Sequence, residues 1–230
     1  MNSAERTLPE GGGRSALLLG ATGLVGSNVL TLLLAAGYAR VAVLTRRKLV
    51  QTDPRMEQHV VDLERMAEHA AAFAADHVFC CLGTTLRAAG SREAFRRVDY
   101  DYVVESARLA AEQGARRYLL VSSLGADAGS RVFYSRVKGE TEDAVRALPL
   151  PSVVILRPSL ILGPRADRRP GEALAQRVTP AMGWLLRGPL RRYRAVDAHT
   201  VARAMVRLAG EDAAGVRVVE SDEIQQIGGA

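Results

Sequence analysis

Residues 15–36 read SALLLGATGLVGSNVLTLLLAA, and they decide how the rest of the chain is interpreted. The apolar run at residues 16–19 has the length of a buried β-strand. It leads into three glycines spaced three residues apart, after which apolar residues recur near helical spacing at Leu24, Val25, Val29, Leu32 and Leu33. A strand, a glycine turn and a helix in this order predict a binding site for the pyrophosphate of a dinucleotide.

Each glycine of this turn has a part in that prediction. Gly20 allows a sharp turn, Gly23 lets a phosphate approach bare backbone at the helix N-terminus, and Gly26 lets the helix pack closely on the strand. The spacing is not the commoner Gly-x-Gly-x-x-Gly, and three glycines can also form an ordinary tight turn. The flanking strand and helix favour the dinucleotide site, whose predicted residues here are Gly20, Thr22, Gly23, Leu24, Val25 and Gly26.

Length and composition are typical of a globular protein. The chain has 230 residues, of which 48% are apolar and 24% charged. We expect a flexible tail at residues 1–14 and a single domain at residues 15–230. No stretch approaches 18 uninterrupted apolar residues, so we expect no membrane span, and the polar start lacks the apolar segment of a secretory signal. These features predict a cytoplasmic protein.

Arginine supplies nearly all of the positive charge. The chain has 29 arginines and two lysines, Lys48 and Lys138, and a lysine retained against this bias indicates that its own chemistry is needed. Arginines are frequent between residues 165 and 194, where they either contact an anionic substrate or form a solvated surface. Aromatic residues are too scarce for us to expect nucleic-acid binding.

The only cysteines, Cys80 and Cys81, are adjacent in an apolar run. Neighbouring strand residues point to opposite faces, so a disulfide between them would be strained. The spacing also matches no metal site. We expect buried structural thiols and no bound metal.

Strand-like and helix-like segments alternate along the chain. Strands are expected at residues 16–19, 41–44, 59–61, 77–82, 118–121, 153–156 and 216–219, and helices at 64–75, 92–113, 134–148, 172–186 and 198–209. Strands separated by helices imply right-handed crossovers and a parallel sheet, so the predicted fold class is a Rossmann-type, doubly wound α/β domain. Residues 159–194 are irregular and are expected to form a small substrate lobe at the carboxyl edge of the sheet.

Arg46 and Arg47 end the second predicted strand, at the position about 20 residues past the glycines that faces the adenosine ribose of a bound dinucleotide. An NAD site would place an acidic residue here, whereas two arginines suit the 2′-phosphate of NADP(H). They predict a preference for NADP(H) over NAD(H), unless they are simply surface arginines. Asp62, after the third strand, either accepts a hydrogen bond from the adenine amino group or caps the next helix.

Tyr134 and Lys138 are four residues apart on a predicted helix and therefore share one face. A nearby cation lowers the pKa of a tyrosine from its usual value of about 10, which makes the phenol a usable acid and base. Ser122 and Ser123 end the preceding strand, at the sheet edge where such folds bind ligands. The constellation predicts proton transfer at a carbonyl or hydroxyl group; the alternative is that Tyr134 and Lys138 merely open an exposed helix.

The glycine turn, Val121-Ser122-Ser123, Tyr134-x-x-x-Lys138 and Leu156-Arg157-Pro158 together resemble the short-chain dehydrogenase/reductase superfamily. Within it, the chain resembles the atypical and extended branch of epimerase/dehydratase-like proteins, and most of all the small TIP30-like NADPH-binding oxidoreductases. Residues 80–85, 97–103 and 134–140 carry this second resemblance.

The resemblance implies roles for individual residues. Tyr134 would be the acid/base, Lys138 would hold the nicotinamide ribose, and a serine, Ser123 before Ser122, would position the substrate. It also implies further cofactor-binding residues, with Gly83 near the adenosine and Pro158 and Ser159 near the nicotinamide amide; the remaining ones are Leu63, Leu82, Thr84, Ser122, Tyr134 and Lys138.

We therefore expect an NADP(H)-dependent oxidoreductase that acts on a small carbonyl or alcohol and is a monomer or homodimer. One alternative is an NADPH-sensing interaction protein with little turnover, which would need only the glycine turn and the arginines. A second is a nucleotide-sugar epimerase or dehydratase, for which the short chain leaves little room and to which Arg46 and Arg47 are poorly suited.

Overall fold

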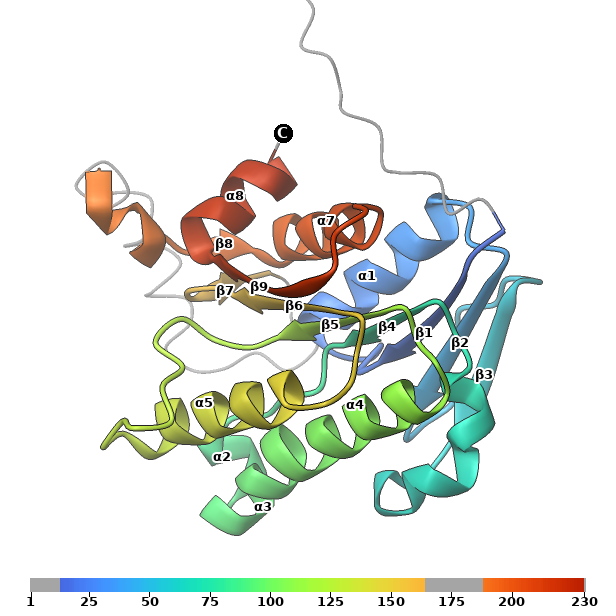
Figure 1. Ribbon diagram of the computed structural model, residues 1–230, viewed down its shortest axis with the longest axis horizontal. Helices are drawn as coiled ribbons and strands as arrows, with labels where there is room; N and C mark the ends of the chain where they lie inside the picture. The colour runs from blue at the N-terminus through green and yellow to red at the C-terminus, as the bar shows by residue number, and fades with distance from the viewer. Residues whose placement is uncertain (1–12, 164–187, 230) are drawn as a thin grey trace, which may run out of the picture.

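The computed structural model describes residues 13–163 and 188–229, which form an α/β fold with helices on both faces of a parallel sheet (Figure 1). The sheet has seven strands in the order β3-β2-β1-β4-β5-β6-β9. The chain winds outward from β1 to one edge and then from β4 to the other, so the predicted doubly wound fold is confirmed. The strands are β1 Ser15–Leu19, β2 Arg40–Thr45, β3 Met56–Val60, β4 His77–Cys80, β5 Arg117–Val121, β6 Ser152–Arg157 and β9 Gly215–Glu220.

Two apolar layers cover the sheet, one on each face. Helices α1 (Leu24–Ala35), α7 (Ala198–Ala209) and α8 (Ser221–Gly229) lie on one face, as the upper layer of Figure 1 shows. The 3₁₀ segment η1 (Leu63–Phe73) and helices α4 (Tyr102–Glu112) and α5 (Phe133–Arg146) cover the other. Because both faces are covered, the central strands are almost continuously apolar.

Short elements complete the described part of the chain. Helices α2 (Leu86–Ala89) and α3 (Arg92–Arg96) and a π-helical turn, η2 (Arg97–Asp101), lie between β4 and α4. At the carboxyl edge of the sheet, β7 (Ile161–Leu162) pairs in parallel with β8 (Val196–Asp197), and η3 (Gly188–Tyr193) precedes β8.

Three expectations about elements were wrong. The helix expected at residues 92–113 is divided into α3, η2 and α4, because a wide π-helical turn is inserted at residues 97–101. The segment expected as a helix at residues 64–75 is largely 3₁₀, with non-helical backbone angles at Arg65 and His69. The third strand begins earlier than expected, at Met56, and α8 was not foreseen.

Part of the expected substrate lobe lies outside the described residues, as do the helix expected at 172–186 and most of the expected tail. Within the described ranges, no helix is long and apolar enough to cross a membrane.

Candidate active site

The glycine turn after β1 has a geometry that side chains would not permit. Gly20 has a φ of +83°, and a β-carbon there would lie 2.5 Å from the carbonyl oxygen of Cys81. A β-carbon on Gly26 would lie 2.1 Å from the carbonyl oxygen of Gly20, so this glycine sets how closely α1 approaches β1. The amide of Gly23 donates a 2.9 Å hydrogen bond to the Gly20 carbonyl and closes the turn.

The first turn of α1 is open to an anion. Its N-cap is Gly23, no side chain caps the helix, and no acidic residue lies in the first turn. The uncapped amides and the positive end of the helix dipole therefore form the kind of surface that binds phosphate. A cleft of about 420 Å³ opens beside this turn, lined by residues 20–23, 44–46, 63, 81–84, 88, 89, 94, 98 and 102. The cleft and the turn fit the pyrophosphate and adenosine part of a dinucleotide.

Arg46 and Arg47 are exposed at the carboxyl end of β2, and Arg46 lines the cleft. Thr45 is buried and shapes this corner, because its hydroxyl donates a 2.8 Å hydrogen bond to the Arg47 carbonyl. Neither guanidinium forms an ion pair with a described residue, so both are available to a ligand phosphate.

Asp62 caps η1, which was one of the two roles expected for it from the sequence. Its Oδ1 accepts a 3.1 Å hydrogen bond from the amide of Glu64, and the residue is exposed outside the lining of the cleft. The neighbouring Leu63 is buried and does line the cleft. The structure therefore accounts for Asp62 without an adenine contact, and that contact stays a prediction.

A buried ion pair lies directly behind the wall of the cleft. The Nζ of Lys138 is 2.8 Å from Oδ1 of Asp99, with side chains only 7% and 0% exposed. Oδ2 of Asp99 accepts a 2.8 Å hydrogen bond from the amide of Thr84. A β-carbon on Gly83 would lie 3.4 Å from Oδ1 of Asp99 and 3.7 Å from Nζ of Lys138. Gly83 lines the cleft, so only this residue separates the Lys138 ammonium group from it.

Burial alone would lower the pKa of Lys138, but the surrounding groups, with the Asp99 carboxylate foremost among them, together raise that pKa. The phenol of Tyr134, one helical turn earlier on α5, is also close enough to contribute in the same direction. The Tyr134 side chain is half-buried, and its ring lies 5.5 Å from the ring of Phe95. Lys138 therefore remains charged beside Tyr134 at neutral pH.

The loop after β5 holds α5 in place. A β-carbon on Gly139 would lie 2.1 Å from the amide nitrogen of Ala128, so only a glycine lets the helix lie this close to the loop. The amide of Asp127 donates a 3.0 Å hydrogen bond to the carbonyl of Ser135. These contacts fix Tyr134 and Lys138 relative to the end of β5.

Ser122 and Ser123 have different surroundings. Ser122 is buried and donates a 2.6 Å hydrogen bond to Glu142, whose side chain is fully buried and paired with Arg157 and Arg146 at 2.6 Å each. Ser123 is half-buried, and its hydroxyl has only a 3.4 Å contact with the carbonyl of Leu124. Of the two serines, Ser123 therefore has the hydroxyl that is less engaged within the chain.

Pro158 and Ser159 lie at the end of β6, next to the β7–β8 pair. The Pro158 carbonyl accepts a hydrogen bond of 2.9 Å from Leu124, and Ser159 is bonded through its amide to Ser221 and through its hydroxyl to the carbonyl of Arg194. The Ser159 side chain is therefore occupied, and a nicotinamide contact here would use the backbone.

Both cysteines are free, and burial raises the pKa of Cys80. Among the described residues, no group of three or more His, Cys, Asp or Glu side chains could hold a metal ion. Sequence reasoning did not single out Asp99, which pairs with Lys138, or Glu142, which accepts a hydrogen bond from Ser122. Asp99 lies inside the stretch 97–103 that carried the family resemblance, which was the one available signal.

A family described as NAD(P)H-binding matches residues 20–212 of the chain. The chain belongs to this NAD(P)H-binding family. It is 41% identical over 169 residues to rat "Protein HTATIP2", covering 71% of this chain and 69% of that protein. It is also 33% identical over 233 residues to "Protein FMP52, mitochondrial" of Coccidioides immitis, covering 92% and 95%. The TIP30-like resemblance is confirmed by the first of these relatives.

Solved structures of the NAD(P)H-binding fold support the same assignment of architecture. A UDP-glucose 4-epimerase from Thermotoga maritima has a TM-score of 0.67 at 18% identity, over 94% of this chain and 82% of that one. The Bordetella bronchiseptica enzyme WbmH, solved with NAD⁺, has a TM-score of 0.68 at 15% identity, over 90% and 75%. At these identities the likeness concerns the fold alone.

The fungal relatives carry names that describe those proteins as mitochondrial. The cytoplasmic location expected for this member of the family therefore stays a prediction.

Proposed function

We propose that the protein is an NADP(H)-dependent oxidoreductase that reduces a small carbonyl compound or oxidises the corresponding alcohol. The observation that carries the proposal is the buried Asp99–Lys138 pair, one turn from Tyr134 and directly behind the Gly83 wall of the dinucleotide cleft. Burying an ion pair away from solvent costs free energy. A site that only bound a dinucleotide would not require such a pair.

Different residues at the carboxyl edge of the sheet would bind different parts of the cofactor. The first-turn amides of α1 would bind the pyrophosphate, and Arg46 and Arg47 would bind the 2′-phosphate by charge-assisted hydrogen bonds. By the family resemblance Lys138 would hold the nicotinamide ribose, which would then lie past Gly83, beyond the part of the cleft that fits the pyrophosphate and adenosine. When bound, the nicotinamide supplies the hydride chemistry.

The chain itself would supply one proton and one hydrogen bond. Tyr134 would transfer the proton through its phenolic oxygen, with the charged Lys138 one helical turn away on α5. The hydroxyl of Ser123 would donate a hydrogen bond to the substrate oxygen on which negative charge develops. Ser122 would act from behind, because its bond to Glu142 fixes the backbone from which Ser123 projects.

Two further parts of the proposal concern partners. The substrate is a small molecule, and it is anionic if arginines of residues 165–194 reach it. The protein acts as a monomer or a homodimer.

The test is a screen of NADPH oxidation over aldehydes, ketones and quinones, with NADPH deuterated at C4 so that label in the product proves direct transfer. We expect turnover with at least one carbonyl class and label in its alcohol. Tyr100→Phe is a matched control for Tyr134→Phe. The ring of Tyr100, on η2, packs under the guanidinium of Arg96, the last residue of α3, and its hydroxyl has no hydrogen-bond partner among the described residues. Tight NADPH binding with no turnover across the panel would replace the proposal with the NADPH-sensing alternative. NAD retained through turnover of a nucleotide sugar would replace it with the epimerase alternative.

A further inference from the structure

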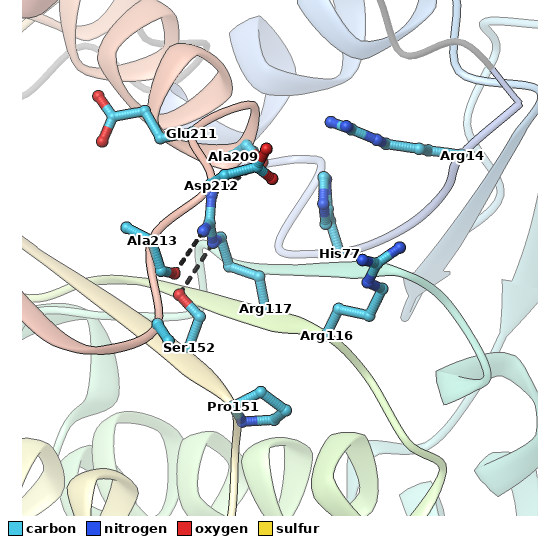
Figure 2. A pocket seen from close by; sticks show the side chains of 11 residues that line it. Arg14, His77, Arg116, Arg117, Pro151, Ser152, Ala209, Glu211, Asp212 and Ala213 are labelled. Atoms are coloured by element: carbon cyan, nitrogen blue, oxygen red, sulfur yellow. Dashed lines mark hydrogen bonds between the residues drawn. The ribbon is translucent and has the colours of Figure 1, made fainter.

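A second cavity lies at the opposite edge of the sheet, where the strands begin. It has a volume of about 350 Å³, and Figure 2 shows the side chains that line it. His77 begins β4, Arg117 begins β5 and Ser152 begins β6, whereas the dinucleotide cleft lies beyond the strand ends. The proposed oxidoreductase chemistry makes no use of this cavity.

Arg117 builds the floor of the cavity. Its guanidinium donates hydrogen bonds to the carbonyls of Leu208 and Ala209 at the end of α7, at 2.6 and 3.0 Å, and to that of Ala213 at 2.6 Å. Its Nε donates to the hydroxyl of Ser152 at 2.9 Å. Four of its five N–H groups are thus used, so Arg117 is a structural cation that fixes the wall.

Arg14 and Arg116 are different, because among the described residues neither guanidinium has a hydrogen-bond acceptor or an ion-pair partner. Figure 2 shows them on either side of His77. Burial and the charges of Arg14, Arg117 and Arg116 lower the pKa of His77 to about 4, with Asp76 acting in the opposite direction. The two free cations therefore flank a neutral imidazole.

The imidazole of His77 can donate a hydrogen bond through its Nε2. Burial raises the pKa of Tyr38, so its phenol stays protonated, and it lies 2.7 Å from Nδ1 of His77. The phenol has no other acceptor among the described residues, so we assign it as the donor to Nδ1. The proton of the neutral imidazole is then on Nε2.

Two carboxylates, Glu211 and Asp212, line the cavity on the side of Arg117, and a third, Asp76, precedes His77 in the chain. Asp76 accepts 2.8 Å hydrogen bonds from both the amide and the hydroxyl of Ser15. Glu211 pairs with Arg217 at 2.5 Å, and Asp212 lies on the loop whose carbonyls Arg117 holds. Among the described residues, no carboxylate forms a hydrogen bond or an ion pair with the guanidinium of Arg14 or Arg116.

We propose that this cavity binds the phosphate monoester of a small organic molecule, held by Arg14, Arg116 and the Nε2–H of His77. Two guanidinium groups suit the dianion of a phosphate ester, which accepts bidentate, charge-assisted hydrogen bonds. Inorganic phosphate alone would leave much of the cavity unfilled, and the side formed by Pro151, Ala209 and Ala214 offers an apolar surface to an organic group. The site is independent of the proposed oxidoreductase function.

The experiment is a calorimetric titration of the full chain with glycerol 3-phosphate, with inorganic phosphate, and with an acidic peptide, at constant ionic strength. The variants are Arg14→Gln, Arg116→Gln and, as the matched control, Arg131→Gln, an exposed arginine that lines neither cavity. A charge-assisted hydrogen bond is worth about 1.5–3 kcal/mol, so each of the first two variants should weaken glycerol 3-phosphate at least about tenfold. Arg131→Gln should leave its affinity unchanged.

A second readout reports the location. Bound phosphate brings negative charge next to His77, so the pKa of that imidazole, followed by NMR, should rise when glycerol 3-phosphate is present. NADPH affinity of Arg14→Gln and Arg116→Gln should equal that of the unmodified chain, which separates this site from the glycine turn. Failure to bind glycerol 3-phosphate, equal weakening in all three variants, or binding of the acidic peptide alone would overturn the proposal. Inorganic phosphate binding as tightly as the ester would overturn the organic part of the ligand.

Discussion

Lys138 and Asp99 form the ion pair on which the electrostatics of the candidate site depend. Both side chains are almost inaccessible to solvent, so each charge is stabilised mainly by the other and by the Thr84 amide. The removal of one partner from such a pair typically costs about 3–5 kcal/mol, because the remaining charge is buried without compensation. The proposed function therefore depends on the same contact as the stability of the fold at this point.

Lys138→Met should lower the free energy of unfolding by about 3–5 kcal/mol, and the double variant Lys138→Met/Asp99→Asn should recover part of that loss. The pKa of Lys138 is raised, so the stability it contributes is fully present below the unfolded value of about 10.4 and is lost only as the pH rises through the folded value. Urea unfolding of both variants at pH 7 checks the prediction. A single variant as stable as the unmodified chain would show that the pair contributes nothing.

Arg46 and Arg47 carry the predicted cofactor preference. One charge-assisted hydrogen bond to the 2′-phosphate is worth about 1.5–3 kcal/mol, so NADPH should bind at least about tenfold more tightly than NADH. Arg46→Ala/Arg47→Ala should remove most of this difference and leave NADH affinity nearly unchanged. Fluorescence titrations give the four dissociation constants, and equal affinities in the unmodified chain would contradict the assignment.

Sequence spacing was enough to find Tyr134 and Lys138, because a separation of four residues on a helix is a local relation. It was not enough for Asp99, which meets Lys138 only after η2 and α5 pack together. Spacing was also not enough for Glu142, which accepts a hydrogen bond from Ser122 and forms ion pairs with Arg146 and Arg157. Partners that tertiary packing brings together have no characteristic spacing in a single sequence.

At the scale of elements, the β1–α1 unit was predicted well, and the region after β4 was not. The glycine turn has a local signature, and the close approach of Gly26 to the Gly20 carbonyl oxygen occurs within residues 20–26. The division of α3, η2 and α4 has no such signature, because an apolar helical pattern continues through residues 92–113. The hydroxyl of Thr141, on α5, donates a 2.9 Å hydrogen bond to the carbonyl of Asp99, so the π-helical turn η2 is in direct contact with α5.

Gly23 and Gly26 should respond differently to the same added methyl group. Gly26→Ala would place a β-carbon 2.1 Å from the Gly20 carbonyl oxygen, which forces α1 away from β1 and should cost about 1–3 kcal/mol of stability. Gly23 has an ordinary φ of −80°, and its β-carbon would keep 3.2 Å from that oxygen. Gly23→Ala should therefore fold normally but bind NADPH at least about tenfold more weakly. Thermal unfolding and titration separate the two effects, and normal NADPH binding by Gly23→Ala would argue against a phosphate at this turn.

At the scale of the whole molecule, the two edges of the sheet have different chemistry. The carboxyl edge carries the glycine turn, the arginine pair and the Tyr134–Lys138 face, whereas the amino edge carries a neutral buried histidine among arginines. The overall alternation of strands and helices was readable from the sequence because it depends on local apolar patterns. The second cavity was not, because Arg14, His77 and Arg116 meet only through the pairing of β1, β4 and β5.

His77 should make the protein sensitive to acid. Its pKa is lowered to about 4 in the folded chain against an unfolded value of about 6.5, so the unfolded chain binds more protons between these values. The stability is fully present above pH 6.5 and should fall by up to about 3 kcal/mol as the pH drops toward 4. His77→Gln keeps an acceptor for Tyr38 but does not titrate, so its stability should depend less on pH in this window. Identical pH profiles of unfolding for the two proteins would contradict the shift.

Turnover by Tyr134→Phe, compared with the unmodified chain and with Tyr100→Phe, tests the proposed chemistry most directly. The substitution keeps the ring and its contact with Phe95 and removes only the hydroxyl. Proton transfer by a positioned side chain is typically worth about 10²–10⁴-fold, so the rate of NADPH-dependent carbonyl reduction should fall by that factor. The dissociation constant of NADPH should hardly change, because the predicted phosphate contacts lie at the glycine turn and at Arg46 and Arg47. A Tyr134→Phe protein that turns over substrate as fast as the unmodified chain would contradict the account.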